Sequence, residues 1–392
     1  MLMQTLSVQN DWGWCENDPP PTSAYIHVPF CTHRCGYCNF SLLANRSDLF
    51  SRYLAALERE LAILTEPRPV STIFIGGGTP SILPLELTEQ MLTMLARWLP
   101  LQGDIVEWSM EANPIDITAE RLALWKSYGV NRISLGGQSF DPSKLAALER
   151  DHSPEQLMRA IKLSKQTMGS VSLDLIFAAP GESLEIWQQD LAAAINCGVD
   201  HLSTYGLTYE KGARFWGLRA RNELDVVSEY DELEMYSHGI DILESSGFEH
   251  YEISNFAQAG HACRHNQTYW QGNPWWAFGP SAARFLGNIR SVNHRSTLTY
   301  LRRIEASESP VEERDVLTAT QKIRERFVFG MRQLAGVNWN ELALQADEAT
   351  RNAIAMKIAE HVEAGWMQRD GDRVRLTRRG LFISDALWSY YL

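Results

Sequence analysis

The chain has 392 residues, 45% of them hydrophobic, so it can bury a large core and form a big domain with an appendage. Its 48 acidic and 36 basic residues give a net charge of -12, which disfavours nucleic acid as a partner. Six cysteines without a legible disulfide pattern favour a reducing compartment, the cytoplasm. No apolar stretch is long enough to cross a bilayer, so membrane contact would be peripheral or through a partner.

Residues 1–22 are polar, acidic and proline-rich, and we expect them to form a lead-in segment rather than a signal peptide. Six later runs predict buried strands, at residues 23–29, 72–78, 105–112, 132–137, 171–177 and 201–208. Apolar residues recur at helical spacing from Leu49 to Leu64, and comparable stretches follow each later strand. Residues 23–210 therefore form βα units, in an open doubly wound sheet or a partial barrel, with the chemistry at the strands' C-terminal ends.

The βα alternation stops near Glu210. A helix at about 228–246, a strand-like run at 250–256 and a segment dense in Trp, Tyr, His and Gly predict an α+β extension over residues 211–310. Residues 311–392 are mostly helical, with a hairpin across Asp370 and Gly371, and resemble a small winged-helix domain. Without a long basic run, this domain is expected to pack or to dock a partner rather than to bind DNA.

Three cysteines, Cys31, Cys35 and Cys38, form a CxxxCxxC motif after the first expected strand. This spacing indicates an iron–sulfur site, and a cubane cluster held by three thiolates leaves one iron open to a small molecule. The alternatives are three cysteines in a turn, or a zinc site completed by His27 or His33. The spacing favours the cluster.

Further polar groups stand at the ends of later strands. Residues 76–80, GGGTP, predict a turn that a ligand can approach closely, although the GxGxxG dinucleotide pattern is absent. Glu111, Gln138 and Asp174 each adjoin a buried run, so they need partners. A ligand with an ammonium, a carboxylate, ribose hydroxyls and an adenine would satisfy them, or each caps a helix. Arg150 either neutralises a carboxylate or is a solvated surface residue.

Together these motifs resemble the radical S-adenosylmethionine (SAM) proteins of the HemN/HemW family. The matching segments are YIHVPFCTHRCGYCNF, IFIGGGTPS, MEANP, NRISLGGQSF and LDLIFAAPGES, in the family's order. The resemblance covers nearly the whole chain and implies an α/β fold: a partial (β/α)6 TIM-like barrel, an α+β region and a winged-helix-like C-terminal domain. It implies that Cys31, Cys35 and Cys38 hold a [4Fe-4S] cluster and that SAM binds its open iron. The implied SAM contacts are Tyr25, Gly76, Gly77, Gly78, Thr79, Glu111, Gln138, Arg150 and Asp174.

Two features separate members of this family. Oxygen-independent coproporphyrinogen III dehydrogenases have a longer N-terminal segment and a further cysteine where this chain has Phe40. The segment HNQTYW matches the HNxxYW signature of the HemW-type haem chaperones. The residues to which the resemblance gives a haem-related role are His265, Asn266, Tyr269 and Trp270. His265 is the candidate iron ligand, with His261 and Cys263 as further candidates; alternatively, the segment hydrogen-bonds and packs beneath a loop.

The resemblance implies a haem chaperone that passes haem to acceptor proteins such as respiratory cytochromes, with a [4Fe-4S] cluster and SAM in support. No catalytic residue is assigned on this hypothesis. The alternative is a radical SAM coproporphyrinogen III dehydrogenase, which decarboxylates its substrate to protoporphyrinogen IX; Phe40 argues against it. A third hypothesis, a radical SAM enzyme on an unrelated substrate, is supported by the SAM motifs and opposed by HNQTYW. The sequence leaves open whether SAM is cleaved and whether the protein is a homodimer.

Overall fold

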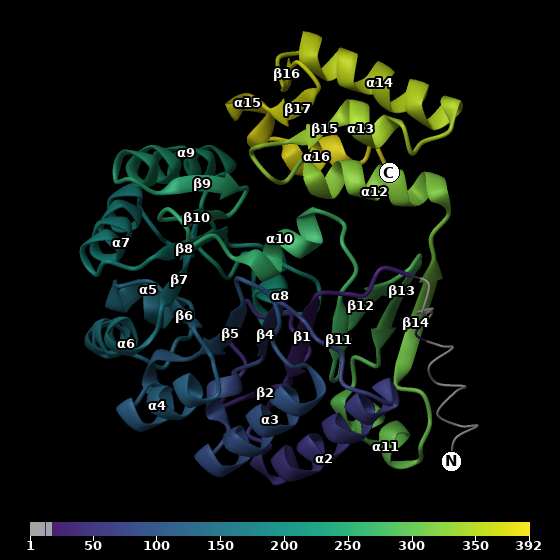
Figure 1. Ribbon diagram of the computed structural model, residues 1–392. Coiled ribbons are helices and arrows are strands. Elements are labelled where there is room, and N and C mark those ends of the chain that lie inside the picture. The colour runs from purple at the N-terminus through teal and green to yellow at the C-terminus, as the bar shows by residue number, and fades with distance from the viewer. Residues whose placement is uncertain (1–11, 13–17) are drawn as a thin grey trace.

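The computed structural model describes Trp12 and residues 18–392. Its main feature is a nine-stranded sheet in the order β11-β1-β4-β5-β6-β7-β8-β10-β9 (Figure 1). Six neighbouring strands of this sheet run parallel. They are β1 (Ser23–Val28), β4 (Thr72–Gly77), β5 (Glu107–Ala112), β6 (Arg132–Gln138), β7 (Ser170–Phe177) and β8 (His201–Gly206). The predicted partial (β/α)6 barrel is confirmed.

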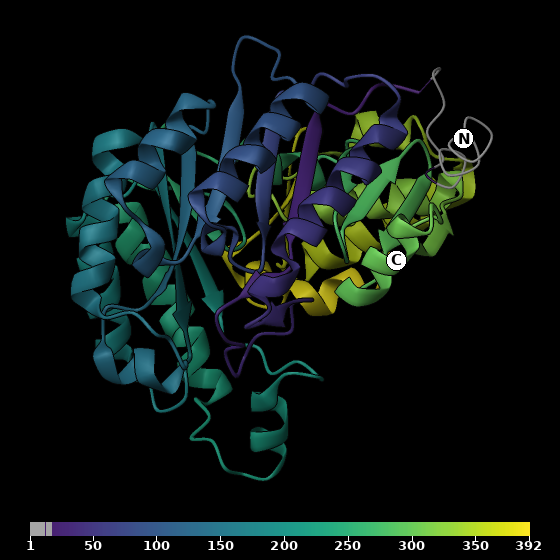
Figure 2. The ribbon, with the colours of Figure 1, turned by 90° about the horizontal axis from the view of Figure 1, so that it is seen from below.

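Helices cover the outer face of the curved sheet (Figure 2). Those between the parallel strands are α2 (Phe50–Leu61), α3 (Leu85–Trp98), α4 (Ala119–Ser127), α5 (Pro142–Ala147), α6 (Pro154–Thr167) and α7 (Leu184–Asn196). After β8 the chain forms α8 (Arg214–Ala220) and α9 (Glu229–Ser245). The apolar side of each amphipathic helix packs on the sheet, which leaves the other face of the sheet as the barrel interior.

The barrel strands separate an apolar outer face from a polar inner face. In β1, Ala24, Ile26 and Val28 are fully buried in the main core beneath the helices. Tyr25 and His27 alternate with them and therefore point to the opposite face, because successive side chains of a strand alternate. The same alternation places polar residues of the neighbouring strands inside, among them Glu111, Ser134, Asp174 and Ser203. The barrel interior is thus suited to a polar ligand.

The two edges of the barrel are extended by later parts of the chain. On one edge β11 (Trp276–Phe278) pairs parallel with β1, and on the other β10 (Asn255–Ala257) pairs antiparallel with β8 and with β9 (Glu249–Glu252). The first and sixth barrel strands do not pair with each other in the observed sheet order, so the barrel remains open.

A second, three-stranded antiparallel sheet lies beside β11. It consists of β12 (Ala283–Leu286), β13 (Ile289–Asn293) and β14 (Val311–Val316), with α11 (Thr297–Glu305) between its last two strands. Trp12, from the expected lead-in segment, is buried here, and its ring centroid lies 5.9 Å from that of Phe278. Residues 1–11 and 13–17 of that segment lie outside the described residues.

The C-terminal part is a small module with its own core, and the predicted winged-helix-like fold is confirmed. Its elements are α12 (Ala319–Gly330), β15 (Val337–Asn338), α13 (Trp339–Ala343), α14 (Glu348–Glu363), β16 (Met367–Asp370), β17 (Arg373–Leu376), α15 (Arg378–Leu381) and α16 (Ser384–Trp388). Figure 1 shows this module, in yellow, beside α9 and α10 (Arg264–Trp270). None of the described helices has the length and apolarity needed to cross a bilayer.

Candidate cofactor site

The three motif cysteines lie on one wall of a cavity at the C-terminal ends of the barrel strands. Cys31 ends the short strand β2 (Phe30–Cys31), and Cys35 and Cys38 follow in the loop that leads to β3 (Leu43–Ala44). The guanidinium of Arg150 donates a hydrogen bond to Sγ of Cys35 at 3.6 Å, which places a positive charge beside the thiols. Burial raises the pKa of Cys31 to about 11, so its thiolate form requires a cation or an iron ion nearby.

The two histidines that a zinc site would use are already engaged. Nε2 of His27 is 2.9 Å from the carbonyl oxygen of Ser41, and its Nδ1 is 3.1 Å from the hydroxyl of Tyr25. Nε2 of His33 is 2.7 Å from the carbonyl of Glu149. Among the described residues, the motif cysteines included, no three His, Cys, Asp or Glu side chains lie in a geometry that would hold a single metal ion. The donor set fits a cluster by its chemistry, since three thiols line one cavity and the guanidinium of Arg150 lies beside Cys35.

The glycine turn, residues 76–79, at the end of β4 packs directly against the segment that carries the cysteines. An added Cβ on Gly78 would lie 2.5 Å from the backbone oxygen of Phe30, and one on Gly76 would lie 2.7 Å from the carboxylate of Glu111. Gly77 has a φ of +107° and faces the ring of His27, so a side chain is excluded there as well. The turn therefore exposes backbone groups, and Gly77, Gly78 and Thr79 line the cavity.

Two carboxylates form the floor of the cavity. Burial, and then the negative charge of Asp174, raise the pKa of Glu111 to about 8, although its Oε2 accepts a hydrogen bond from Gly77 N at 3.0 Å. Burial raises the pKa of Asp174 to about 6, and hydrogen bonds from Ser203 and Ser134 limit the shift. Two buried carboxylates favour a cationic ligand, because its charge would stabilise their ionised forms.

Gln138 and Arg150 complete this side of the cavity. Gln138 ends β6 with a φ of +64°, a conformation that requires support from its surroundings. Arg150 follows α5, and its Nη2 donates to the carbonyl oxygen of Gly136 at 2.9 Å. Glu149, the residue before Arg150, also has a positive φ of +57°, so both loops must be anchored for the side chains of Gln138 and Arg150 to face the cavity.

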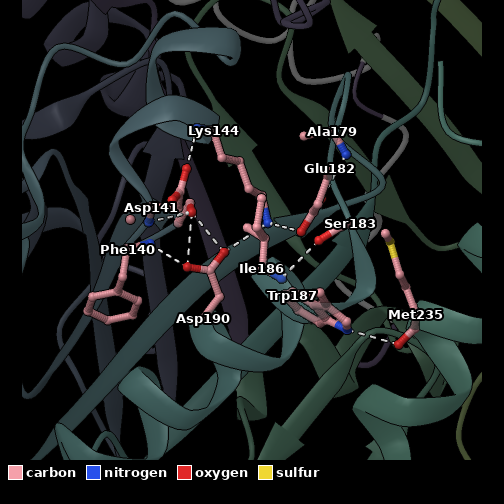
Figure 3. Close-up of polar contacts among 12 residues, drawn as sticks. Phe140, Asp141, Lys144, Ala179, Glu182, Ser183, Ile186, Trp187, Asp190 and Met235 are labelled. Atoms are coloured by element: carbon pink, nitrogen blue, oxygen red, sulfur yellow. Dashed lines mark hydrogen bonds and ion pairs between the residues drawn. The ribbon is translucent and has the colours of Figure 1, made fainter. Parts of the chain in front are cut away.

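A buried ion network anchors these loops (Figure 3). The ammonium of Lys144, in α5, lies 2.5 Å from Glu182 and 2.9 Å from Asp190, and all three side chains are at most 2% exposed. Asp190 also accepts hydrogen bonds from the backbone N–H of Phe140 and the hydroxyl of Ser139, which directly follow Gln138. The network thus ties the β6–α5 turn to α7.

The cavity has a volume of about 1500 Å³. Small-molecule sites typically measure about 300–1000 Å³, so there is room for more than one ligand. The side opposite the cysteines is formed by α9 and by the segment Leu381–Ala386 of the C-terminal module. Residues of this side that the sequence analysis missed include Tyr205, Tyr230, Leu233, Tyr236, Arg332 and Phe382. They belong to no recognisable motif, and only tertiary packing brings them together.

The residues of the HNQTYW segment form α10, which closes the other end of the barrel. Glu107, the first residue of β5, accepts hydrogen bonds from the backbone N–H groups of Arg264 and His265. The hydroxyls of Thr268 and Ser23, the first residue of β1, are 2.8 Å apart. Because the cysteines lie at the C-terminal ends of the strands, α10 and the cysteines occupy opposite ends.

Both ring nitrogens of His265 have partners in this position. Nδ1 is 2.9 Å from Oγ1 of Thr72, and Nε2 is 2.7 Å from the hydroxyl of Tyr269. Burial lowers the pKa of His265 to about 3, so its ring is neutral.

Four of the predicted site residues do not line the large cavity. They are Asn266 and Trp270 of the haem-related set and Tyr25 and Gly76 of the predicted SAM contacts. The Tyr25 ring instead lies between His27 and the Phe74–His265 pair.

Two known protein families together match most of the chain. Residues 25–194 match the Radical SAM superfamily, and residues 317–383 match the HemN C-terminal domain. The first match contains the cysteine motif, the glycine turn and both floor carboxylates.

Similar proteins extend the match to nearly full length. The chain is 32% identical to the heme chaperone HemW of Bacillus subtilis, with 94% of this chain and 99% of that protein covered. It is 33% identical to the heme chaperone HemW of Escherichia coli K12, with coverage of 95% and 98%. Among solved structures, coproporphyrinogen III oxidase HemN of Escherichia coli matches with a TM-score of 0.84 at 20% identity, covering 100% of this chain and 93% of that chain. At this identity the last comparison shows a common fold alone.

Proposed function

Because the chain belongs to the HemW family within the radical SAM superfamily, we propose that it is a haem chaperone that binds haem and transfers it to haem-dependent acceptor proteins. The observation that carries this proposal is the similarity, at 32–33% identity and over nearly the full length of both chains, to proteins named heme chaperones. The acceptors would be haem proteins such as respiratory cytochromes, and the exchange would take place in the cytoplasm.

In this proposal Cys31, Cys35 and Cys38 would hold a [4Fe-4S] cluster, with SAM in the adjoining part of the cavity. The cluster would supply an electron to the sulfonium of SAM. The chain's own contribution is to orient and shield: the glycine turn offers backbone groups, and Arg150 places a positive charge beside Cys35. Glu111 and Asp174 would face the cationic part of SAM.

The proposal divides the chain by role as well as by structure. Residues 23–210 would hold the cluster and SAM, and residues 211–310 would close the barrel with α9 and α10. Residues 311–392 would complete the cavity and present a surface to acceptors. Transfer then needs only a difference in affinity, since haem must leave once an acceptor offers a better site.

Anaerobic titration of the cluster-reconstituted protein with haem tests this function. The proposal expects saturable binding near one haem per chain, and loss of the bound haem when an apo-cytochrome is added. The same sample, given SAM, a reductant and coproporphyrinogen III, should not consume the porphyrinogen. Porphyrinogen consumption without saturable haem binding would overturn the proposal.

The alternative is radical SAM coproporphyrinogen III dehydrogenase activity. It is favoured by one observation, the match of residues 317–383 to the HemN C-terminal domain. Phe40 stands where those enzymes have a further cysteine, and this exposed residue lines the cavity. The titration above therefore also decides between the two functions.

A further inference from the structure

We propose that haem binds in the large cavity, against the wall formed by α9 and the C-terminal module, and that α10 with its HNQTYW segment is a plug of the barrel rather than the haem ligand. This inference rests on the proposed function, haem binding. It identifies the haem-binding site as an apolar wall that contacts the macrocycle and an arginine that contacts its carboxylates.

The first argument is the exposure of apolar side chains on this wall. Tyr230 and Leu233 of α9 are 67% and 41% exposed, and Ile383 of the C-terminal module is 37% exposed. Tyr205, near the end of the adjoining strand β8, is 43% exposed, and all four line the same cavity. Large exposed apolar side chains that gather in one place usually mark a surface that a ligand or partner covers. A flat, apolar macrocycle would cover these side chains, and the burial of their apolar surface would contribute favourably to the binding free energy.

The wall is also held rigidly. The Tyr236 ring stacks on Phe177 with centroids 5.9 Å apart, and Phe382 of the C-terminal module meets Tyr236 edge-on at 5.8 Å. Arg378 of that module donates a hydrogen bond to Asp241 of α9 at 2.6 Å. The two parts of the wall are therefore fixed to each other, and little ordering is needed when a ligand binds.

The charges on the cavity wall orient the proposed ligand. Arg332 lines the cavity, its guanidinium lies 4.7 Å above the Trp270 ring, and within the described part of the chain its buried Nε has no hydrogen-bond partner. A propionate of haem would pair with the part of this guanidinium that lines the cavity, through a charge-assisted hydrogen bond. The other two arginines that line the cavity, Arg150 and Arg295, lie against the cysteine loop. Besides the floor carboxylates, the acidic lining residues are Glu210, Glu229, Glu232 and Asp385, which would repel a carboxylate. On the wall away from the cysteines, the propionate edge is therefore expected at Arg332.

The second argument is the state of His265. Both of its ring nitrogens are hydrogen-bonded within the protein, and the residue is only 1% exposed. To coordinate iron, His265 would have to give up its hydrogen bond to Thr72 or to Tyr269, and the iron would have to enter a tightly packed part of the protein. The hydrogen bonds from α10 to β1, β4 and β5 instead close the barrel end.

Three variants of the full-length, cluster-reconstituted protein test the proposal by anaerobic titration with haemin. The double variant L233D/I383D places two charges on the proposed wall, at exposed positions that tolerate them, and R332Q removes the proposed carboxylate partner. Each should weaken haemin binding at least about tenfold, the effect of ~1.4 kcal/mol. Tyr269→Phe frees Nε2 of His265 and should leave both the affinity and the Soret spectrum unchanged. Leu344→Asp is the matched control, because Leu344 is 84% exposed and does not line the cavity.

The outcomes separate the two proposals. If the wild-type protein does not bind haemin saturably, the proposed function fails. If the wild-type protein binds haemin but L233D/I383D and R332Q bind it with the same affinity, the wall is not the haem-binding site and the inference is overturned. A Soret shift and tighter binding in Tyr269→Phe would also overturn it, since they would identify His265 as the ligand. Iron and sulfide content and the melting temperature of each variant show that the fold is retained.

Discussion

The hydroxyl of Thr79 lies 3.2 Å from Sγ of Cys31, so the glycine turn after β4 touches the first cysteine of the motif. The contact joins segments 48 residues apart. It is supported by backbone hydrogen bonds from Gly78 N to Val28 and from Thr79 N to Phe30. The turn and the cysteine loop are therefore one unit, and a change in either is expected to disturb the other.

Gly78→Ala tests this coupling. The added Cβ would meet the backbone of Phe30 and Val28 at 2.5–2.8 Å, and backbone atoms cannot move aside as a flexible side chain can. We expect the variant to bind less cluster after reconstitution and to bind SAM at least about tenfold more weakly, a loss of ~1.4 kcal/mol. The measurements are iron content and calorimetric SAM titration. Gly169→Ala is the control, because its nearest neighbour would be 3.4 Å away; equal cluster content in both variants would argue against the coupling.

Cys35→Ser is expected to abolish the cluster while leaving the chain folded. A serine oxygen is a poor replacement for a thiolate, and the remaining two cysteines cannot hold a cubane cluster with one open iron. Visible absorption and iron content after reconstitution check this, and circular dichroism checks the fold. Cys197→Ser, on the outer side at the end of α7, should keep the cluster. A fully retained cluster in Cys35→Ser would refute the assignment of its ligands.

Much of this site could be predicted because the C-terminal ends of parallel strands meet at one edge of a sheet. Six βα units predict that Glu111, near the end of one strand, and Asp174, on another, lie near the cysteines, and all of them line one cavity. Local patterns were sufficient for this part, since strand order and direction follow from the crossovers.

The opposite wall could not be predicted in the same way. Tyr236 and Phe382 meet at 5.8 Å although they are 146 positions apart, and neither belongs to a motif. Similarly, the place of α10 depends on contacts such as that between Ser23 and Thr268, which are separated by 245 positions. Such contacts arise from packing between modules, for which spacing along the chain carries no signal.

SAM binding should depend on pH through Glu111. Burial raises the pKa of this carboxyl to about 8, so at pH 7 the ligand-free protein holds it mostly protonated. A cationic ligand favours the ionised form, so binding releases a proton and affinity rises with pH by up to about tenfold per unit below pH 8, then levels off. Calorimetry from pH 6 to 9, in two buffers of different ionisation enthalpy, measures the affinity and the released proton.

Glu111→Gln provides the control for this pH dependence. The amide keeps the shape of the side chain but cannot titrate, so the slope between pH 6 and 8 should disappear and the affinity at pH 8 should fall. Some dependence should remain around pH 6, because Asp174 has a pKa of about 6. An affinity of the wild-type protein that does not change between pH 6 and 8 would show that Glu111 does not face the cation.

Lys144→Met should destabilise the protein far more than the loss of a surface lysine. The ammonium of Lys144 lies between the carboxylates of Glu182 and Asp190, and its removal leaves two buried negative charges without a cation (Figure 3). Removing one partner of a buried ion pair typically costs about 3–5 kcal/mol, whereas an exposed pair contributes about 0–1 kcal/mol. Lys165→Met is the matched control, since Lys165 pairs with Asp200 while its side chain is 35% exposed.

Urea unfolding of both lysine variants measures the difference in their stability. SAM titration shows whether the loss of the Lys144 ammonium also alters the cavity. Asp190 holds the backbone of Phe140, two residues after Gln138, so loss of the ammonium is expected to loosen the turn that presents Gln138. SAM affinity should therefore fall in Lys144→Met and not in Lys165→Met. If Lys144→Met unfolds at the same urea concentration as Lys165→Met, leaving two buried carboxylates unpaired has not lowered the free energy of unfolding. The network would then neither stabilise the barrel nor position its turn.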